Sequence, residues 1–150
     1  MISLVLNNVT MLSDLVRNGG NIVTDDSLET AVLISLFTRG RARPGDVLPE
    51  PLGNRGGYWG DSYPDVPGDQ MGSRLWLLSR SIASQEVVNQ AQVYSQEALD
   101  WMVVDGVARS VVAETERRAE DVLAFKVSIE KPTDVASRWQ GAWTAHLSEL

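Results

Sequence analysis

The sequence predicts an α+β fold in which central helices pack on a small antiparallel sheet formed mainly by the C-terminal third, with a long Gly/Pro-rich ordered loop. Three stretches carry this prediction. Residues 26–38 are apolar on nearly every helical face, and residues 122–129 alternate polar and apolar side chains. Residues 40–72 hold five of the six prolines and eight of the twelve glycines, a density that excludes regular elements. The length of 150 residues favours one domain, 1–150.

Residues 1–24 are typical of short strands and turns. Apolar side chains alternate from Ile2 to Leu6, and Asn18-Gly19-Gly20-Asn21 predicts a tight turn because Gly and Asn tolerate positive φ. Ile22 and Val23 then form a second short strand. We therefore expect a hairpin in this region.

The helix predicted over 26–38 has capping signals at its start. Asp25, Asp26 and Ser27 offer N-cap oxygens, and Glu29 stands three residues after Asp26, as in a capping box. A helix that is apolar all round is normally buried, so this segment is expected to be the central core helix. It ends at Thr38-Arg39-Gly40.

Residues 40–72 are not a simple linker. They carry Tyr58, Trp59, Tyr63 and Val66. Long loops without regular structure are usually functional or disordered. The aromatic side chains favour an ordered loop that carries a contact surface.

Two further helices are expected between residues 72 and 106. A short apolar run over 75–78 is followed by a helix of about 20 residues, which Ser84 caps and Asp105-Gly106 closes. Its core stripe recurs at three- and four-residue spacing and consists of Val87, Ala91, Tyr94, Ala98, Trp101 and Met102.

The C-terminal third predicts antiparallel strands. Residues 107–113 alternate, residues 117–121 form a charged connection, and residues 122–129 alternate again. Pro132-Thr133-Asp134 predicts another turn. Residues 138–147 suit a strand better than a tail helix, since Trp139, Trp143 and other apolar residues share one parity.

Composition excludes several function classes. Cysteine is absent, which removes disulfides and thiolate chemistry, and the single histidine, His146, excludes a multi-histidine metal site. Thirteen basic against twenty acidic residues give a net charge of −7, which argues against a general nucleic-acid binder. No apolar run reaches the ~20 residues of a membrane span. Residues Met1 to Thr10 lack the basic start and the small-residue cleavage site of a signal peptide, so synthesis and folding in a cytoplasm are expected.

Catalytic signals are weak. No Gly-x-Ser-x-Gly motif is present, and Gly56-Gly57-Tyr58-Trp59-Gly60 lacks the Lys-Ser/Thr of a phosphate loop. Asp61, Asp65 and Asp69 are spaced by four residues but cross two prolines, which makes them a weak calcium signal. The sequence therefore predicts no enzyme activity, cofactor, metal or small-molecule substrate.

Arginine and tryptophan are more informative. Trp76 and Trp101 lie in helical apolar stripes and are expected in the core. Aromatic residues and arginine are enriched where proteins bind one another, and this description fits Trp59 with Arg39, Arg41, Arg43 and Arg55. The alternative is that these arginines are solvated or pair with neighbouring Asp residues.

Four segments together resemble a known family. They are residues 26–38 (DSLETAVLISLFT, followed by Arg41-Ala42), 55–61 (RGGYWGD), 72–80 (GSRLWLLSR) and 97–102 (EALDWM, with DGVA at 105–108). Their order and spacing resemble the small baseplate wedge proteins of Mu-like contractile-tailed bacteriophages. That family is in turn similar to the T-even baseplate wedge protein, which sits at the tube–sheath junction and helps to start the sheath.

The resemblance implies a structural role in a contractile tail baseplate, with binding to neighbouring wedge and sheath subunits. It also implies assembly in the host cytoplasm and a final place in the virion tail baseplate. The predicted interface residues are Arg39, Arg41, Arg55, Tyr58, Trp59, Asp61 and Arg74. A free edge of the C-terminal sheet would add a second docking site, because an unpaired edge can accept another chain's strand.

The alternative is a peptidoglycan-cleaving or carbohydrate-binding module of the tail. Its site would be Asp61 or Asp65 together with Trp59, because aromatic faces beside carboxylates suit sugars. This alternative rests on analogy alone.

Overall fold

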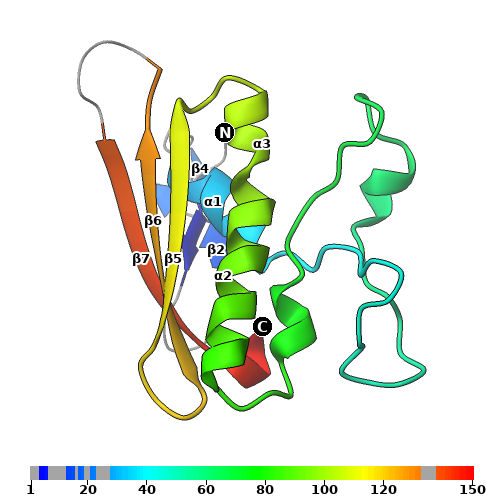
Figure 1. Ribbon diagram of the computed structural model, residues 1–150. Helices are drawn as coiled ribbons and strands as arrows, with labels where there is room; N and C mark the ends of the chain where they lie inside the picture. The colour runs from blue at the N-terminus through cyan, green and yellow to red at the C-terminus, as the bar shows by residue number, and fades with distance from the viewer. Residues whose placement is uncertain (1–3, 7–12, 16, 19–20, 23–27, 133–137) are drawn as a thin grey trace.

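A computed structural model describes residues 4–6, 13–15, 17–18, 21–22, 28–132 and 138–150 of the chain. Helices α1 (Leu28–Phe37), α2 (Gln85–Leu99) and α3 (Trp101–Val104) pack against one face of a three-stranded antiparallel sheet (Figure 1). The strands β5 (Ser110–Arg117), β6 (Val122–Glu130) and β7 (Arg138–His146) are ordered β5-β6-β7. This architecture confirms the predicted α+β fold.

The core lies between this sheet and the helices. Leu123, Phe125, Val127 and Ile129 of β6 are all buried, as their period-two spacing predicts. The Phe125 ring meets Phe37 of α1 edge to face, with 6.0 Å between ring centroids. Buried residues from both layers form one continuous cluster, so the central-helix prediction for α1 is confirmed.

The third strand is a strand and not a helix, and one glycine shapes its inner face. Trp139 and Trp143 lie on either side of Gly141, with 6.0 Å between ring centroids. A Cβ at Gly141 would lie 2.4 Å from the Trp143 ring and 2.6 Å from the Trp139 ring. The absence of a side chain at 141 therefore lets both indoles lie over the strand.

The long helix begins as predicted and divides near its end. The Ser84 hydroxyl accepts the Val87 N–H at 3.3 Å, which is the expected N-cap bond. The predicted helix of about 20 residues is divided at Asp100, although Asp100 keeps helical torsions (φ −61°, ψ −27°). The apolar run at 75–78 forms the short 3₁₀ helix η2 (Leu75–Leu78), which is fully buried.

The N-terminal part contains two short antiparallel pairs. Strand β1 (Leu4–Leu6) pairs with β2 (Ser13–Leu15), and β3 (Arg17–Asn18) pairs with β4 (Asn21–Ile22). The β3–β4 pair forms a hairpin across the predicted turn, but Leu4–Leu6 of the predicted strand at residues 2–6 pairs with Ser13–Leu15 and not with the strand at residue 22. The predicted turn glycines, the cap residues of the first helix and the turn at 133–134 lie outside the described residues.

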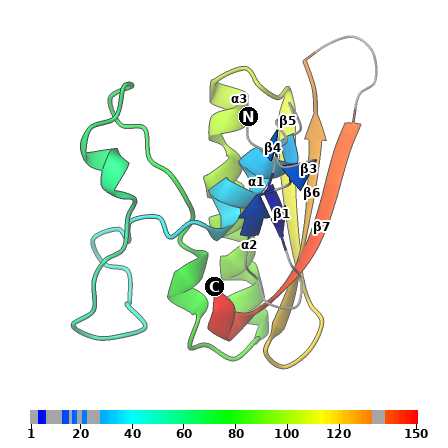
Figure 2. The ribbon, with the colours of Figure 1, turned by 180° about the vertical axis from the view of Figure 1, so that it is seen from behind.

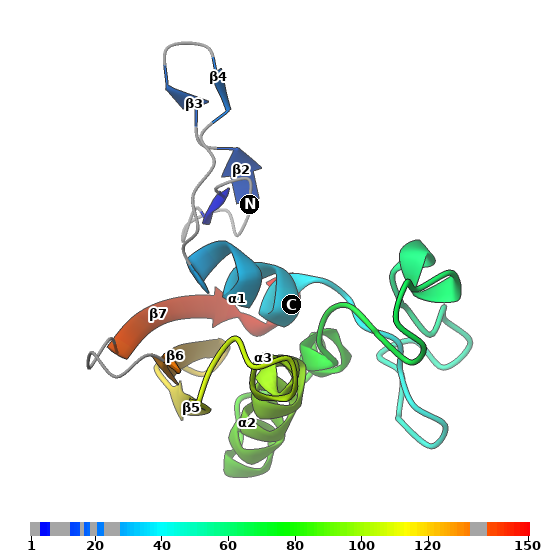
Figure 3. The same ribbon diagram turned by 90° about the horizontal axis from the view of Figure 1, so that it is seen from above.

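Residues 40–72 extend to one side of the body (Figures 1 and 2). They contain one short 3₁₀ helix, η1 (Trp59–Ser62), and otherwise follow an irregular path. Seen from above, this segment and strands β1–β4 project in different directions from α1 (Figure 3). In the described part of the chain, every helix is too short or too polar to span a bilayer.

Candidate interaction site

The two ends of residues 40–72, the irregular segment, are joined by hydrogen bonds beside the C-terminal end of α1. The Gly40 N–H donates to the Ser73 carbonyl at 2.8 Å, and the Ser73 N–H donates to the Thr38 carbonyl at 2.9 Å. Gly72 has φ +95°, and a Cβ there would lie 2.5 Å from the Thr38 oxygen. The indole N–H of Trp76 donates to the Gly40 carbonyl at 2.8 Å, which ties this junction to the core. The segment is thus anchored at its base.

A largely buried ion-pair cluster fastens the segment to α2. The Arg74 guanidinium is 13% exposed and binds Asp46 at 2.9 Å and Glu97 at 2.5 Å. It also lies 4.4 Å from the centroid of the Tyr94 ring. Burial alone would lower the pKa of Arg74, but hydrogen bonds and the negative charges of Glu97 and Asp46 outweigh it and raise the pKa. Arg74 therefore stays charged and links three parts of the chain.

Arg55 and Arg39, two other arginines of the predicted set, also make contacts in the segment or beside it. The Arg55 guanidinium donates to the Arg43 carbonyl, and the Ala42 N–H donates to the Arg55 carbonyl at 2.8 Å. Arg39 lies 5.8 Å from the Trp76 ring centroid while remaining exposed. Arg41 is exposed and forms no ion pair within the described part of the chain. Arg39 and Arg41 are therefore the arginines of the predicted set that remain open to solvent.

The outer lobe of the segment, defined here as residues 57–71, exposes aromatic side chains. Trp59 is 77% exposed and Tyr63 is 86% exposed, and the Tyr58 and Trp59 ring centroids are 5.3 Å apart. Of thirteen exposed large apolar residues in the described chain, seven lie in residues 40–72: Val47, Leu52, Tyr58, Trp59, Tyr63, Val66 and Met71. Concentrated exposed apolar surface is a hallmark of an interaction site.

A cleft of about 420 Å³ lies between the outer lobe and helices α1 and α3. Four carboxylates line it: Asp61, Asp65, Asp69 and Asp105. One oxygen of Asp61 accepts the Met71 N–H at 3.1 Å, and the other is buried without a hydrogen-bond partner among the described residues. No Lys, Arg or His side chain is part of this lining. We call this feature the acidic cleft.

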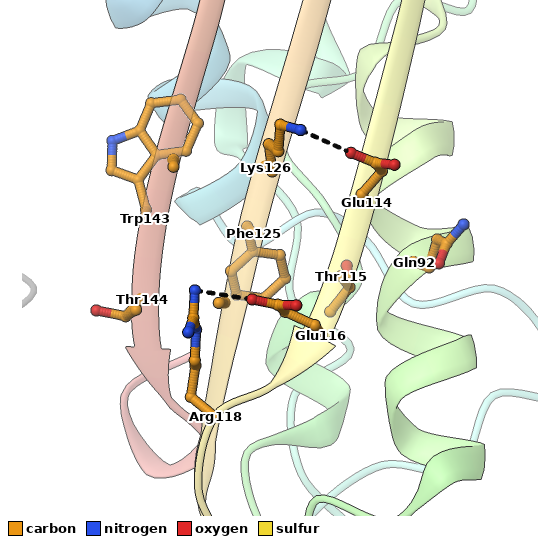
Figure 4. Close-up of a pocket in the computed structure, with 11 residues that line it drawn as sticks. Gln92, Glu114, Thr115, Glu116, Arg118, Phe125, Lys126, Trp143 and Thr144 are labelled. Carbon is orange, nitrogen blue, oxygen red and sulfur yellow. Dashed lines mark ion pairs between the residues drawn. The ribbon is translucent and has the colours of Figure 1, made fainter.

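A second hollow, of about 670 Å³, lies on the outer face of the sheet (Figure 4). Its charged residues are internally paired, with Lys126 to Glu114 at 3.4 Å and Arg118 to Glu116 at 2.8 Å. These ion pairs are exposed, so each contributes at most about 1 kcal/mol to stability. Charge in this hollow is balanced, unlike in the acidic cleft.

The two edges of the sheet differ. The side chain of Gln96 on α2 occupies two backbone groups of the β5 edge, since it donates to the Val111 carbonyl and accepts the Ala113 N–H, both at 3.0 Å. Within the described residues, β7 has no strand beyond it. In this part of the chain, β7 is thus an edge strand with β6 as its one strand neighbour.

Sequence reasoning placed Tyr58, Trp59 and Asp61 in one predicted interface, and all three lie in the outer lobe. It did not predict that Arg74 contacts Asp46, Glu97 and Tyr94, or that Gln96 binds β5. Those contacts join positions 15 to 28 residues apart, and no local pattern marks them. In the described residues, no group of His, Cys, Asp or Glu is arranged to hold a metal ion.

Comparison with known proteins places the chain among proteins of bacteriophages. The family model for Phage protein GP46 matches residues 28–136, so the chain belongs to that family. It is 40% identical to Baseplate protein gp46 of Escherichia phage Mu over 119 residues, which cover 79% of this chain and 80% of that protein. It is 42% identical to Mu-like prophage FluMu protein gp46 of Haemophilus influenzae over 119 residues, 79% of each chain. The predicted resemblance is confirmed.

Proposed function

We propose that this protein is a non-enzymatic structural component of a contractile phage tail baseplate. It binds neighbouring wedge and sheath subunits during tail assembly in the host cytoplasm and remains in the virion tail baseplate. The name of the Mu relative supports the baseplate role. The observation that carries the binding role is the concentration of exposed apolar side chains in residues 40–72.

The first binding surface is the outer lobe with the adjoining arginines. Trp59 and Tyr58 supply large apolar faces, and Arg39 and Arg41 supply charge at the base of the lobe. Such residues dominate the energetics of protein interfaces. Arg55 and Arg74 of the predicted set act on this surface indirectly, because they hold the segment in place.

The second binding surface is the open edge of β7. Among the described strands none pairs with the side of β7 that faces away from β6, so the backbone donors and acceptors on that side can pair with a strand of a neighbouring subunit. The two bonds from Gln96 to β5 support this assignment, because they occupy backbone groups that strand addition at β5 would need.

Co-expression with the products of adjacent tail genes tests the proposal. The wild-type chain is expected to copurify with at least one of them, and Trp59→Ala is expected to weaken that complex. Ile82→Ala is the matched control, because Ile82 is 70% exposed but lies outside residues 40–72. Failure of every such pairing, or equal loss in both variants, would count against the proposal.

The alternative, a peptidoglycan-cleaving or carbohydrate-binding module, is supported by one observation. The acidic cleft places Asp61 and Asp65 in the same lobe as the exposed Trp59. A cell-wall release assay separates the two functions. Release of wall fragments that is lost in Asp61→Asn, with folding intact, would favour the alternative and contradict a purely structural role.

A further inference from the structure

We propose that the acidic cleft receives a basic side chain, an arginine above all, carried on an apolar segment of a neighbouring subunit. This inference rests on the proposed function and adds the chemistry of the partner. The cleft is bounded by the outer lobe on one side and by α1 and α3 on the other, so a side chain that enters it contacts both the segment and the body.

The charge of the cleft selects the sign of its occupant. None of its four carboxylates has an ion-pair partner among the described residues, and no basic side chain lines it, so the cleft carries uncompensated negative charge. The inner oxygen of Asp61 is out of water and lacks a donor. Such an oxygen is costly to leave unpaired, and a guanidinium or ammonium group of the occupant would supply the missing donor.

The apolar part of the lining selects the rest of the occupant. Ile34 and Ala98 line the wall on the body side, and Tyr63 and Met71 line the lobe side. Trp101 lies in the same wall and is held by the bond from its indole N–H to the Ser35 hydroxyl at 3.0 Å. An arginine has an apolar stem and a flat guanidinium that stacks on aromatic rings, so it matches both parts of this lining.

The protein already holds one arginine of its own between carboxylates and an aromatic ring. Arg74 lies on the Tyr94 ring between two carboxylates, those of Asp46 and Glu97. The acidic cleft offers the same components, carboxylates beside aromatic rings, but lacks the arginine. We infer that the neighbouring subunit supplies it.

Binding of two synthetic peptides to the full-length chain tests this inference. The first peptide is an acetylated, amidated pentapeptide with arginine between leucines, and the second has neutral citrulline in place of arginine. Titrations are followed by NMR of the isotope-labelled protein, including the indole N–H of Trp101. The arginine peptide is expected to bind at least about tenfold more tightly than the citrulline peptide.

Two double variants test whether the arginine peptide binds in the acidic cleft. Asp65→Asn with Asp69→Asn is expected to reduce the affinity for the arginine peptide to that for the citrulline peptide, and both side chains are exposed, so the fold is retained. Glu86→Gln with Glu120→Gln removes the same charge at exposed positions outside the cleft and is expected to leave the affinity unchanged.

Three results would overturn the inference. They are equal binding of the two peptides, equal loss in both double variants, and saturable binding of calcium chloride at the cleft without binding of the arginine peptide. Each leaves the copurification test of the proposed function untouched. Conversely, peptide binding without any tail complex would contradict the baseplate role and leave the cleft's ligand chemistry standing.

Discussion

The body, made of the helices and the C-terminal sheet, buries its apolar side chains, whereas the irregular segment exposes them. Nearly all buried apolar residues come from the helices and the C-terminal sheet, and only Ala42 of residues 40–72 is among them. The same segment supplies seven of the thirteen exposed large apolar residues in the described chain. The body is therefore stabilised by burial, whereas the segment is held by a few directed bonds at its base. Apolar surface that the chain leaves uncovered is available to a partner.

The largest expected effect separates folding from binding. Phe125 is 1% exposed and packs on Phe37, so Phe125→Ala is expected to lower the free energy of unfolding by about 3–5 kcal/mol. Trp59→Ala removes a side chain that is 77% exposed and is expected to change that free energy by less than about 0.5 kcal/mol. Urea unfolding followed by circular dichroism measures both.

In copurification with tail proteins, by contrast, Trp59→Ala is expected to weaken the complex although it hardly changes the free energy of unfolding. A loss of more than about 2 kcal/mol of stability on Trp59→Ala would mean that the outer lobe belongs to the folded core. In that case the contrast between the two regions would not hold.

The second prediction concerns the junction of body and segment. Gly72 and Gly68 have similar torsions, φ +95° and +88°, but a Cβ would meet the Thr38 carbonyl at Gly72 and nothing within 4 Å at Gly68. Gly68→Ala is expected to cost only the left-handed strain, about 1 kcal/mol. Gly72→Ala adds a backbone clash and is expected to cost about 2–4 kcal/mol. Thermal unfolding of the two variants measures the difference. Equal losses of stability would show that the backbone at the junction shifts easily to make room for the Cβ at position 72.

Periodic parts of the sequence predicted the structure well. The all-round apolar helix became the buried α1, the alternation of residues 122–129 became β6 with its inner face in the core, and Ser84 capped α2. In each case the determinant lies within a few residues of the element. Burial of Trp76, and packing of Trp101 against the core, follow from the same helical spacing.

The site was less predictable because its contacts are non-local. Residues 40–72 have no period, so spacing does not indicate that Arg74 reaches back to Asp46, or that Asp105 joins three aspartates of the lobe. The sequence predicted for Asp105 only a place at the end of the long helix. The contacts of Gln96 with β5 and of Arg74 with Glu97 also depend on which element packs beside each side chain, which the tertiary structure alone determines.

The third prediction compares two arginines that share one carboxylate. Arg74 and Arg43 both bind Glu97, but Arg74 is 13% exposed and Arg43 is 61% exposed. Arg74→Ala leaves Asp46 without an ion-pair partner and Glu97 with only the exposed Arg43, and it is expected to cost about 1–3 kcal/mol of stability. Arg43→Ala is expected to cost about 0–0.5 kcal/mol, because water screens an exposed pair. Chemical denaturation provides both values, and a larger cost for Arg43 would contradict the assigned role of Arg74.

The smallest expected effect tests the packing beneath Arg74 through pH. Burial raises the pKa of Tyr94 above its ordinary value, although the positive charge of Arg74 opposes this. Above that ordinary value, about 10, the phenol ionises in the unfolded chain before it ionises in the folded chain. The free energy of unfolding should therefore fall as pH rises beyond it, and melting temperatures between pH 9 and 11 should fall less in Tyr94→Phe than in the wild type. Parallel pH profiles would show that the ring beneath Arg74 is open to water, and that the base of the segment is no more closed than its outer lobe.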